Sequence, residues 1–311
     1  MRSLFVMDPI ERINVRGDST YVTMRECCDR GWPVAYCTPD QLYALGGRAR
    51  ATIRWVDVTA SEPHFAVKGV EDLALSDFDV VWMRKDPPFH MGYIFSTYLL
   101  DMAHTLVVNA SAGIKLFNEK LWAQAAFAEF QPPTLIANDQ RRIRAFVEEH
   151  GQTVLKPWDG NGGRGVLVTE PGDRNMSSMI EILTAEGRDY ILAQRYIPGV
   201  VNGDKRILLF DGDPVGAILR VPTGKDHRAN MHVGATVEKT DLDERDRAIC
   251  AALGPQLKKH GQTFVGIDVI DGWLTEINVT SPTGLQECNR LYGRKLEAEL
   301  VDRVERLARE S

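Results

Sequence analysis

The chain has 311 residues, 44% of them apolar and 26% charged, which is enough for two or three domains with a substantial core. Its formal net charge of −6 gives no general attraction to nucleic acid or an anionic membrane, and no apolar run is long enough to cross a bilayer. The five cysteines are odd in number and form no C-x-x-C pair. This argues against a disulfide framework or a zinc site and predicts a reduced, cytoplasmic protein.

The first third of the chain alternates apolar strand and helix patterns. The predicted elements are a strand at 4–7, a helix at 19–30, a strand at 33–37, a short helix at 40–45, a buried strand at 78–83, a helix at 92–104 and a strand at 105–109. This βαβ rhythm predicts an open parallel sheet with helices on both faces.

A second segment begins near residue 118, where Asn118 can cap a helix over 119–129. The elements predicted after it are a strand at 134–137, a helix capped by Asp139 that ends at His150, a glycine-rich loop, a helix at 175–187 and a strand at 190–197. The last part is predicted to hold strands at 206–210 and 215–221, a mobile loop at 222–235, a helix at 243–260, a hairpin at 263–280 and a helix at 294–310. The predicted domains are 1–117, 118–198 and 199–311.

The glycine-rich loop contains a G-x-G-x-x-G pattern at Gly160, Gly162 and Gly165. A dinucleotide-binding fingerprint requires a helix after these glycines, but the strand-like residues 166–169 follow them here. The loop is therefore predicted to join two strands, so that its backbone N–H groups can wrap an anion. An ordinary glycine hairpin is the alternative. The nearby Lys156 favours a phosphate-binding loop, in which Arg164 could reach a phosphate or point to solvent.

The predicted hairpin at 263–280 turns around Asp271-Gly272, and its register decides where its carboxylates lie. A two-residue turn would bring Glu276 into the apolar face of the strands. A three-residue loop, 270–272, pairs residue 267 with 275 and keeps the apolar residues together. We therefore expect the three-residue loop.

This register gathers Asp268, Glu276 and Asn278 on the face opposite the apolar residues. Two carboxylates and an amide oxygen, without His or Cys, suit Mg²⁺ that shares its coordination with substrate phosphates. A solvated polar face is the alternative interpretation.

Local basic residues supply further candidates for phosphate contacts, namely Lys120, Lys156, Lys205, Arg206 and Arg220. Together with the glycine loop and the predicted metal site, they indicate a nucleoside triphosphate. The chain contains neither the P-loop motif nor the protein-kinase motifs.

The pattern resembles the ATP-grasp superfamily, and within it most closely the bacterial glutathione synthetase family. The matching segments run nearly end to end: Val6–Ile10, Met83–Phe89, Asn118–Leu121, Leu155–Pro157, Asp159-Gly160 with Gly162-Gly163, Gly203–Arg206 and Thr275–Thr283. The strings Met-Arg-Lys-Asp-Pro-Pro-Phe and Glu-Ile-Asn-Val-Thr-Ser-Pro are specific, whereas the glycine run alone is not. The resemblance implies an ATP-grasp fold of mixed α/β and α+β type, in which the N-terminal parallel-sheet domain precedes two ATP-grasp subdomains.

The resemblance also implies a role for each matching residue. The ATP-binding residues would be Lys120, Lys156, Gly160, Gly162, Gly163, Gln194, Tyr196, Ile197, Asp204 and Lys205, with the backbone of 194–197 holding adenine. Mg²⁺, or Mn²⁺ in its place, would be held by Asp268, Glu276 and Asn278. Arg206 and Arg220 would be catalytic, facing the transferred phosphoryl group and the acyl intermediate. Substrate would contact Arg84, Arg228, Asn230, Ser281 and Thr283, with 222–235 as a lid.

The activity implied by the resemblance is the ATP-dependent ligation of γ-glutamylcysteine and glycine through an acyl phosphate. The resemblance also implies a homo-oligomer, and no nucleic-acid or membrane partner is expected. Two alternatives remain open at this point. One is a carboxylate–amine ligase of the same superfamily for another acid and amine, and the other is a module that binds Mg-ATP without catalysis.

Overall fold

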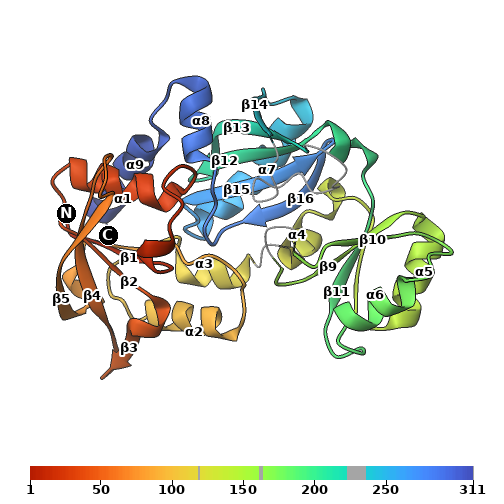
Figure 1. The fold of residues 1–311 in the computed structure, drawn as a ribbon, viewed down its shortest axis with the longest axis horizontal. Coiled ribbons are helices and arrows are strands. Elements are labelled where there is room, and N and C mark those ends of the chain that lie inside the picture. Colours follow the sequence, from red (N-terminus) through yellow and green to blue (C-terminus); the bar gives the residue numbers. More distant parts are fainter. Residues whose placement is uncertain (118–119, 161–163, 223–235, 311) are drawn as a thin grey trace.

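The computed structural model describes residues 1–117, 120–160, 164–222 and 236–310. In these residues the strands form three sheets in sequence order, of seven, four and five strands. Figure 1 shows the five-stranded sheet in the middle of the long axis, with the seven-stranded sheet at one end and the four-stranded sheet at the other. No helix in the described ranges is long and apolar enough to cross a membrane.

The seven-stranded sheet combines a parallel core with an antiparallel extension. Its strands are β1 (Ser3–Val6), β2 (Val34–Cys37), β3 (Leu42–Leu45), β4 (Arg48–Val58), β5 (Phe65–Ala74), β6 (Val80–Met83) and β7 (Leu106–Val108). The strands β2, β1, β6 and β7 are parallel, as predicted. The strand β4 runs antiparallel to β2, β3 and β5, so the predicted parallel sheet is wrong for this extension alone.

The predicted helix over 40–45 is also wrong. A single 3-10 turn at Pro39–Gln41 leads directly into β3, which pairs with β4 across the turn Gly46-Gly47. Both glycines have positive φ, 59° and 77°, as the tight two-residue turns of β-hairpins require. This glycine pair is the sequence signal for β3 and β4.

Helices cover both faces of the seven-stranded sheet, as predicted. The helices α1 (Ser19–Asp29) and α9 (Leu296–Glu310) pack on one face, and α2 (Met91–Leu100) and α3 (Ser111–Leu116) lie against the other. Because α9 packs on α1, the last residues of the chain return to the N-terminal sheet, and Figure 1 shows both termini at the same end of the molecule.

The four-stranded sheet is antiparallel, in the order β10-β9-β11-β8. Its strands are β8 (Thr134–Ala137), β9 (Thr153–Pro157), β10 (Leu167–Thr169) and β11 (Ile191–Arg195). Apolar residues of one face pack on α5 (Gln140–His150) and α6 (Met176–Leu183). The side chain of Asp139 accepts the backbone N–H groups of Arg141 and Arg142 and so caps α5, as predicted.

The helix predicted over 119–129 is shorter in the structure. The described part is α4 (Leu121–Ala126), which a single 3-10 turn at Ala128–Phe130 follows. The predicted cap Asn118 and its neighbour Glu119 lie outside the described residues.

The five-stranded sheet has the order β14-β13-β12-β15-β16. Its strands are β12 (Asp204–Phe210), β13 (Asp213–Val221), β14 (Thr236–Lys239), β15 (Phe264–Ile270) and β16 (Trp273–Asn278). Apolar residues of one face pack on α7 (Glu244–Lys259), while α8 (Leu285–Tyr292) packs on part of the other face. Most of the predicted loop at 222–235 lies outside the described residues, since only Pro222 is described.

One buried side chain ties the N-terminal sheet to the five-stranded sheet. Asn109, directly after β7, donates to the carbonyl oxygens of Phe264 and Val279, each at 2.7 Å, and accepts the N–H of Phe264 at 2.8 Å. Because these hydrogen bonds are buried, losing the amide would leave backbone groups unsatisfied. Asn109 therefore fixes the position of β15 relative to β7.

Candidate functional site

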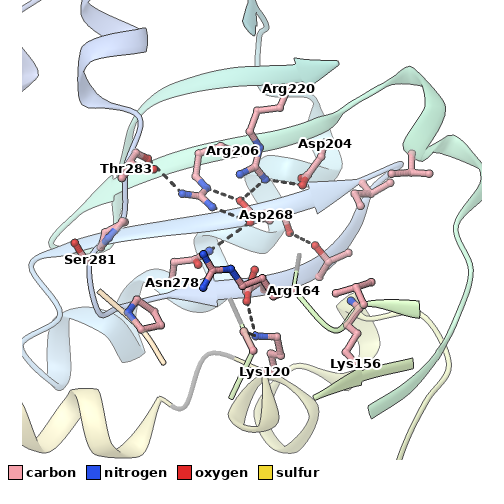
Figure 2. Close-up of a pocket in the computed structure, with 18 of the residues that line it drawn as sticks. Lys120, Lys156, Arg164, Asp204, Arg206, Arg220, Asp268, Asn278, Ser281 and Thr283 are labelled. Carbon is pink, nitrogen blue, oxygen red and sulfur yellow. Dashed lines mark hydrogen bonds and ion pairs between the residues drawn. The ribbon is translucent and has the colours of Figure 1, made fainter. Parts of the chain in front are cut away.

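A cavity of about 880 Å³ lies where strands of the four- and five-stranded sheets meet loops of the N-terminal domain. Its walls come from β9–β11 on one side, from the polar face of β12, β13, β15 and β16 on another, and from the loops at 12–18, 86–87 and 280–283. Figure 2 shows the charged side chains that point into this space from the strands. The cavity is large enough for a nucleotide with a second substrate.

The β15–β16 hairpin places Asp268, Glu276 and Asn278 on one face, although its register differs from the predicted one. The turn has two residues, Asp271 and Gly272, with φ of 50° and 73°, and Ile270 pairs with Trp273. The pairing then shifts after Asp268, so that Asp268 lies opposite Glu276. The prediction of a three-residue loop is therefore wrong.

A β-bulge at Thr275 explains how both preferences are met. One extra residue on β16 lets the Asp-Gly turn keep its favoured two-residue form and still returns Glu276 to the polar face. Leu274, rather than Thr275, takes the buried position beside Val269. A bulge of this kind cannot be predicted from alternation alone, because alternation assumes that each residue of one strand lies opposite one residue of the other.

Asp268 is the centre of a buried ion-pair cluster. Its carboxylate accepts from Arg206, through Nε and through Nη2 at 2.9 Å, and lies 3.0 Å from Nη2 of Arg220. Arg220 also bonds the carboxylate of Asp204, at 2.5 Å. Burial alone would raise the pKa of Asp268, but the two guanidinium groups outweigh burial and hold this pKa well below its usual range.

Glu276 and Asn278 extend this cluster toward the four-stranded sheet. Oε1 of Glu276 lies 2.8 Å from Nζ of Lys120, which also donates to the carbonyl of Gly160. The amide nitrogen of Asn278 lies 3.4 Å from Oδ2 of Asp268, so the amide oxygen points away from this carboxylate. Figure 2 shows the Asp268, Asn278 and Lys120 side chains around one space.

The donor set suits a hard divalent cation that also binds phosphate. In the described part of the chain no three His, Cys, Asp or Glu side chains form a group that could hold a metal alone. Two carboxylates and one amide oxygen would therefore leave coordination positions for phosphate oxygens and water, as Mg²⁺ usually requires. Oδ1 of Asp204 and Nε of Arg220 are buried without a hydrogen-bond partner among the described residues, as expected beside a ligand site.

Lys156 points from β9 into the cavity, on the face opposite the buried Leu155. Its ammonium group donates to the side-chain oxygen of Gln194 at 2.8 Å, and Gln194 in turn donates to Thr134 at 2.9 Å. Burial lowers the pKa of Lys156 to about 8, against the opposing attraction of Glu276. An anion bound beside this ammonium group would restore its charged form.

The glycine loop joins β9 to β10, two antiparallel strands, so the predicted strand–loop–strand arrangement is confirmed. A Cβ at Gly160 would lie 2.6 Å from Cγ of Pro157, which leaves no space for a side chain there. Arg164 lines the cavity, which favours the reading in which it reaches the ligand. Gly162 and Gly163 lie outside the described residues.

Two predicted site residues are not in the cavity. Lys205 points to the other face of β12, where it pairs with Asp246 on α7 and lies 3.4 Å from Asp243. The alternation of a strand explains this, because Asp204 and Arg206 share the cavity face and the residue between them must point away. Lys205 is therefore removed from the ATP-binding set.

Arg84 does not line the cavity but supports its wall. It is buried, donates to the carbonyl of Pro282 at 2.9 Å and to Thr20 at 3.0 Å, and lies over the ring of Phe264. Ser281 and Thr283, on either side of Pro282, do line the cavity. Arg84 thus positions the predicted substrate-binding segment rather than contacting the cavity itself.

The remaining predicted residues divide between the cavity and the undescribed loop. Gln194, Tyr196 and Ile197 line the cavity at the end of β11. Arg228 and Asn230 lie outside the described residues. Outside the segment 194–197, six charged lining residues carried no predicted role: Arg12, Arg16, Asp18, Asp86, Glu287 and Arg290. Asp86 belongs to the specific Met-Arg-Lys-Asp-Pro-Pro-Phe string, whereas the others lie where sequence gives no local signal.

Comparisons with known proteins agree with this arrangement. The prokaryotic glutathione synthetase N-terminal domain matches residues 1–115, and the ATP-grasp domain of the same family matches residues 119–293. A glutathione synthetase from Rhodopseudomonas palustris is 45% identical over 302 residues, covering 96% of both chains. One from Synechocystis is 40% identical over 314 residues, covering 97% of this chain and 98% of the relative.

Solved structures show the fold. The crystal structure of a D-cycloserine synthetase superposes with a TM-score of 0.68 at 18% identity, covering 98% of this chain and 99% of that chain. A RimK domain ATP-grasp protein from Sphaerobacter thermophilus gives a TM-score of 0.65 at 16% identity, with 98% and 99% covered. The predicted ATP-grasp fold is confirmed.

Proposed function

Because the chain belongs to the prokaryotic glutathione synthetase family, we propose that it joins γ-glutamylcysteine to glycine while ATP is converted to ADP and phosphate. The observation that supports this most is the buried pair of guanidinium groups, Arg206 and Arg220, around Asp268 in the same cavity as Lys156. Fixed cations in a site shielded from water suit the stabilisation of a phosphoryl group in transfer.

The proposed reaction has two steps. First, an oxygen of the cysteinyl carboxylate attacks the γ-phosphorus of ATP, the bond from that phosphorus to the β,γ-bridging oxygen breaks, and ADP leaves behind an acyl phosphate. Then the amine of glycine attacks the acyl carbon, phosphate leaves with the electrons of the carbon–oxygen bond, and the amine loses a proton. The chain forms no covalent bond to substrate; it positions the reactants and neutralises charge.

We assign the two arginines to the reacting groups. Arg206 and Arg220 would face the transferred phosphoryl group and the acyl intermediate, which suits their burial and their position on the cavity face. Arg228 and Asn230 are assigned by resemblance to a lid that keeps water from the acyl phosphate. Ser281 and Thr283 would contact the dipeptide, supported by their place in the cavity wall.

The nucleotide is assigned to the side of the cavity formed by the four-stranded sheet. Lys120 and Lys156 would bind phosphates, together with the backbone of Gly160, Gly162 and Gly163. The end of β11, with Gln194, Tyr196 and Ile197, would hold adenine, and Asp204 completes the set. Support comes from the cavity lining, which includes every described member of this group.

Asp268, Glu276 and Asn278 would hold Mg²⁺, or Mn²⁺ in its place. When bound, the ion would neutralise charge on the triphosphate. Among the described residues, Lys120 pairs with Glu276, and Arg206 and Arg220 pair with Asp268. These cations would then be shared between the carboxylates and the phosphates.

Three further assignments complete the proposal. The proposed domains are 1–117, 118–198 and 199–311, with α9 of the last packed on α1 of the first. A reducing compartment, the cytoplasm, is supported by the five cysteines, all of which are unpaired. A homo-oligomer is carried over from the family alone.

The proposed function is tested by measuring phosphate release with purified protein, Mg²⁺ and ATP. We expect release only when γ-glutamylcysteine and glycine are both present, with one glutathione formed per phosphate. Release with another acid and amine but not with this pair would support a different ligase of the superfamily. ATP binding without release in the presence of any pair would support a module without catalysis.

The lowered pKa of Lys156 predicts a pH dependence of ATP affinity. Phosphate binds the protonated ammonium group, and in the free protein this group loses its proton as the pH rises through about 8. The dissociation constant of ATP should therefore rise about tenfold per pH unit above that value. Titration calorimetry at pH 7 to 9.5 measures it. The Lys156→Arg variant should lack this slope because arginine stays charged; an equal slope in both proteins would contradict the assignment.

A further inference from the structure

The wall of the cavity supplied by the N-terminal domain and α8 differs in charge from the rest. Three acidic side chains, Asp18, Asp86 and Glu287, line it together with three basic ones, Arg12, Arg16 and Arg290. Figure 1 shows the N-terminal domain at the opposite end of the long axis from the four-stranded sheet, which supplies most of the proposed ATP contacts, with α8 beside the five-stranded sheet between them. A balanced set of both signs suits a zwitterion rather than a polyphosphate.

Glu287 is the unexplained member of this set. It is only 6% exposed, and its Oε1 accepts from Nη2 of Arg290 at 2.8 Å. Its Oε2 is buried and has no hydrogen-bond partner among the residues that the structure describes. A buried carboxylate oxygen without a donor is unfavourable for the folded protein, so a hydrogen bond donated by a ligand would remove this cost.

The backbone around Glu287 is held in place by contacts that do not use this oxygen. Gln286 donates to the carbonyls of Val15 and Asp18, at 3.1 and 2.7 Å, and Arg290 donates to the carbonyl of Arg16 at 2.9 Å. The loop at 14–18 is therefore fixed to α8 by its neighbours. Glu287 is not needed as the anchor of this loop.

Gly17 leaves space beside the same carboxylate. A Cβ built on it would lie 3.6 Å from Oε1 of Glu287, and its φ lies outside the left-handed region, so the backbone does not require glycine. Gly17 lines the cavity beside this carboxylate and has no side chain to narrow the cavity there. A small cationic group could approach there.

We propose that Glu287 binds the α-ammonium group of the substrate's γ-glutamyl residue, and that Arg16 and Arg290 lie beside the α-carboxylate of the same γ-glutamyl residue. This inference rests on the proposed function, because it assumes that γ-glutamylcysteine is the acid. The cysteinyl end of that dipeptide must reach Arg206, whose Nη1 lies 3.3 Å from the carbonyl of Thr283. Thr283 stands just before α8, so the cavity wall continues from the reacting carboxylate to Glu287.

The test compares γ-glutamylcysteine with glutarylcysteine, which lacks only the ammonium group, in the wild type and in Glu287→Gln. A charge-assisted hydrogen bond predicts that the wild type prefers γ-glutamylcysteine by about 10- to 100-fold in kcat/KM. In Glu287→Gln this preference should fall to within about threefold of unity. The KM of ATP and the activity with glutarylcysteine should stay near the wild-type values.

Glu299→Gln is the matched control, because Glu299 also pairs with an arginine, Arg294, but lies on the outer surface of α9. It should keep the full preference. The proposal is overturned if Glu287→Gln still discriminates like the wild type, or if it loses activity with both acids equally. A wild type that does not discriminate overturns it without any variant. A wild type that releases no phosphate with γ-glutamylcysteine and glycine overturns the proposed function itself.

Discussion

Glu276→Gln is expected to lower kcat by about a thousandfold while the protein stays folded. The substitution removes the charge of a proposed metal ligand that lies in the centre of the cavity, and losses of this size follow when one preorganised charge contact of a reacting site is removed. The fold should survive because the Glu276 side chain is 25% exposed and glutamine can still accept a hydrogen bond from Lys120.

The measurement is phosphate release at saturating substrates, with thermal unfolding as the test of folding. Glu71→Gln is the matched control, because Glu71 is an exposed glutamate on β5 of the N-terminal sheet. It should leave kcat unchanged. Near-normal turnover by Glu276→Gln would remove this residue from the site.

Asp268→Asn is expected to act mainly on stability. It leaves Arg206 without its carboxylate and Arg220 with Asp204 alone, and both guanidinium groups are buried. Removing one partner of a buried ion pair typically destabilises a protein by about 3–5 kcal/mol, because the remaining charge is left uncompensated. Urea unfolding followed by tryptophan fluorescence would measure this loss, and turnover would be lost with it.

A double variant distinguishes an uncompensated buried charge from a simple loss of packing as the cause of the lower stability. The double variant Arg206→Gln, Asp268→Asn removes one uncompensated charge together with the carboxylate. Its loss of stability should be clearly smaller than the sum of the two single losses, as for residues in direct contact. Losses that add would mean that Arg206 and Asp268 do not stabilise each other.

The contrast between these two carboxylates could not be read from the sequence. Alternation along 263–279 was enough to place Asp268, Glu276 and Asn278 on one face. It did not show that Asp268 is enclosed by two arginines while Glu276 is partly open to solvent, because Arg206 and Arg220 come from strands β12 and β13. Burial of this kind depends on contacts between distant segments.

Sequence patterns predicted an element correctly where a single strong signal determined it, and incorrectly where two signals conflicted. The Asp139 cap, the strand–loop–strand at the glycines and the parallel core of the first sheet follow from the sequence. The register of the β15–β16 hairpin does not, because the Asp-Gly turn and the alternation conflict until the bulge at Thr275 reconciles them. The prediction that Lys205 binds ATP is wrong for another reason. It rested on the positive charge of this residue, whereas the alternation of a strand directs Lys205 to the face opposite Arg206.

Glu287 shows what the sequence leaves hidden even when the family is clear. Nothing in the string around it distinguishes a helix-surface glutamate from a buried one. Only the docking of α8 against the loop at 14–18 buries it in the cavity wall. The same docking is why we assign it a substrate contact.

The central claim is that this cavity transfers the γ-phosphoryl group of ATP to a carboxylate before the amine attacks. The most direct measurement uses γ-glutamylcysteine labelled with ¹⁸O in the cysteinyl carboxylate, with phosphate analysed by mass after one turnover with glycine. An acyl phosphate predicts one ¹⁸O atom in each phosphate released, because the attacking oxygen leaves with the phosphorus. Unlabelled phosphate, formed together with glutathione, would contradict the claim.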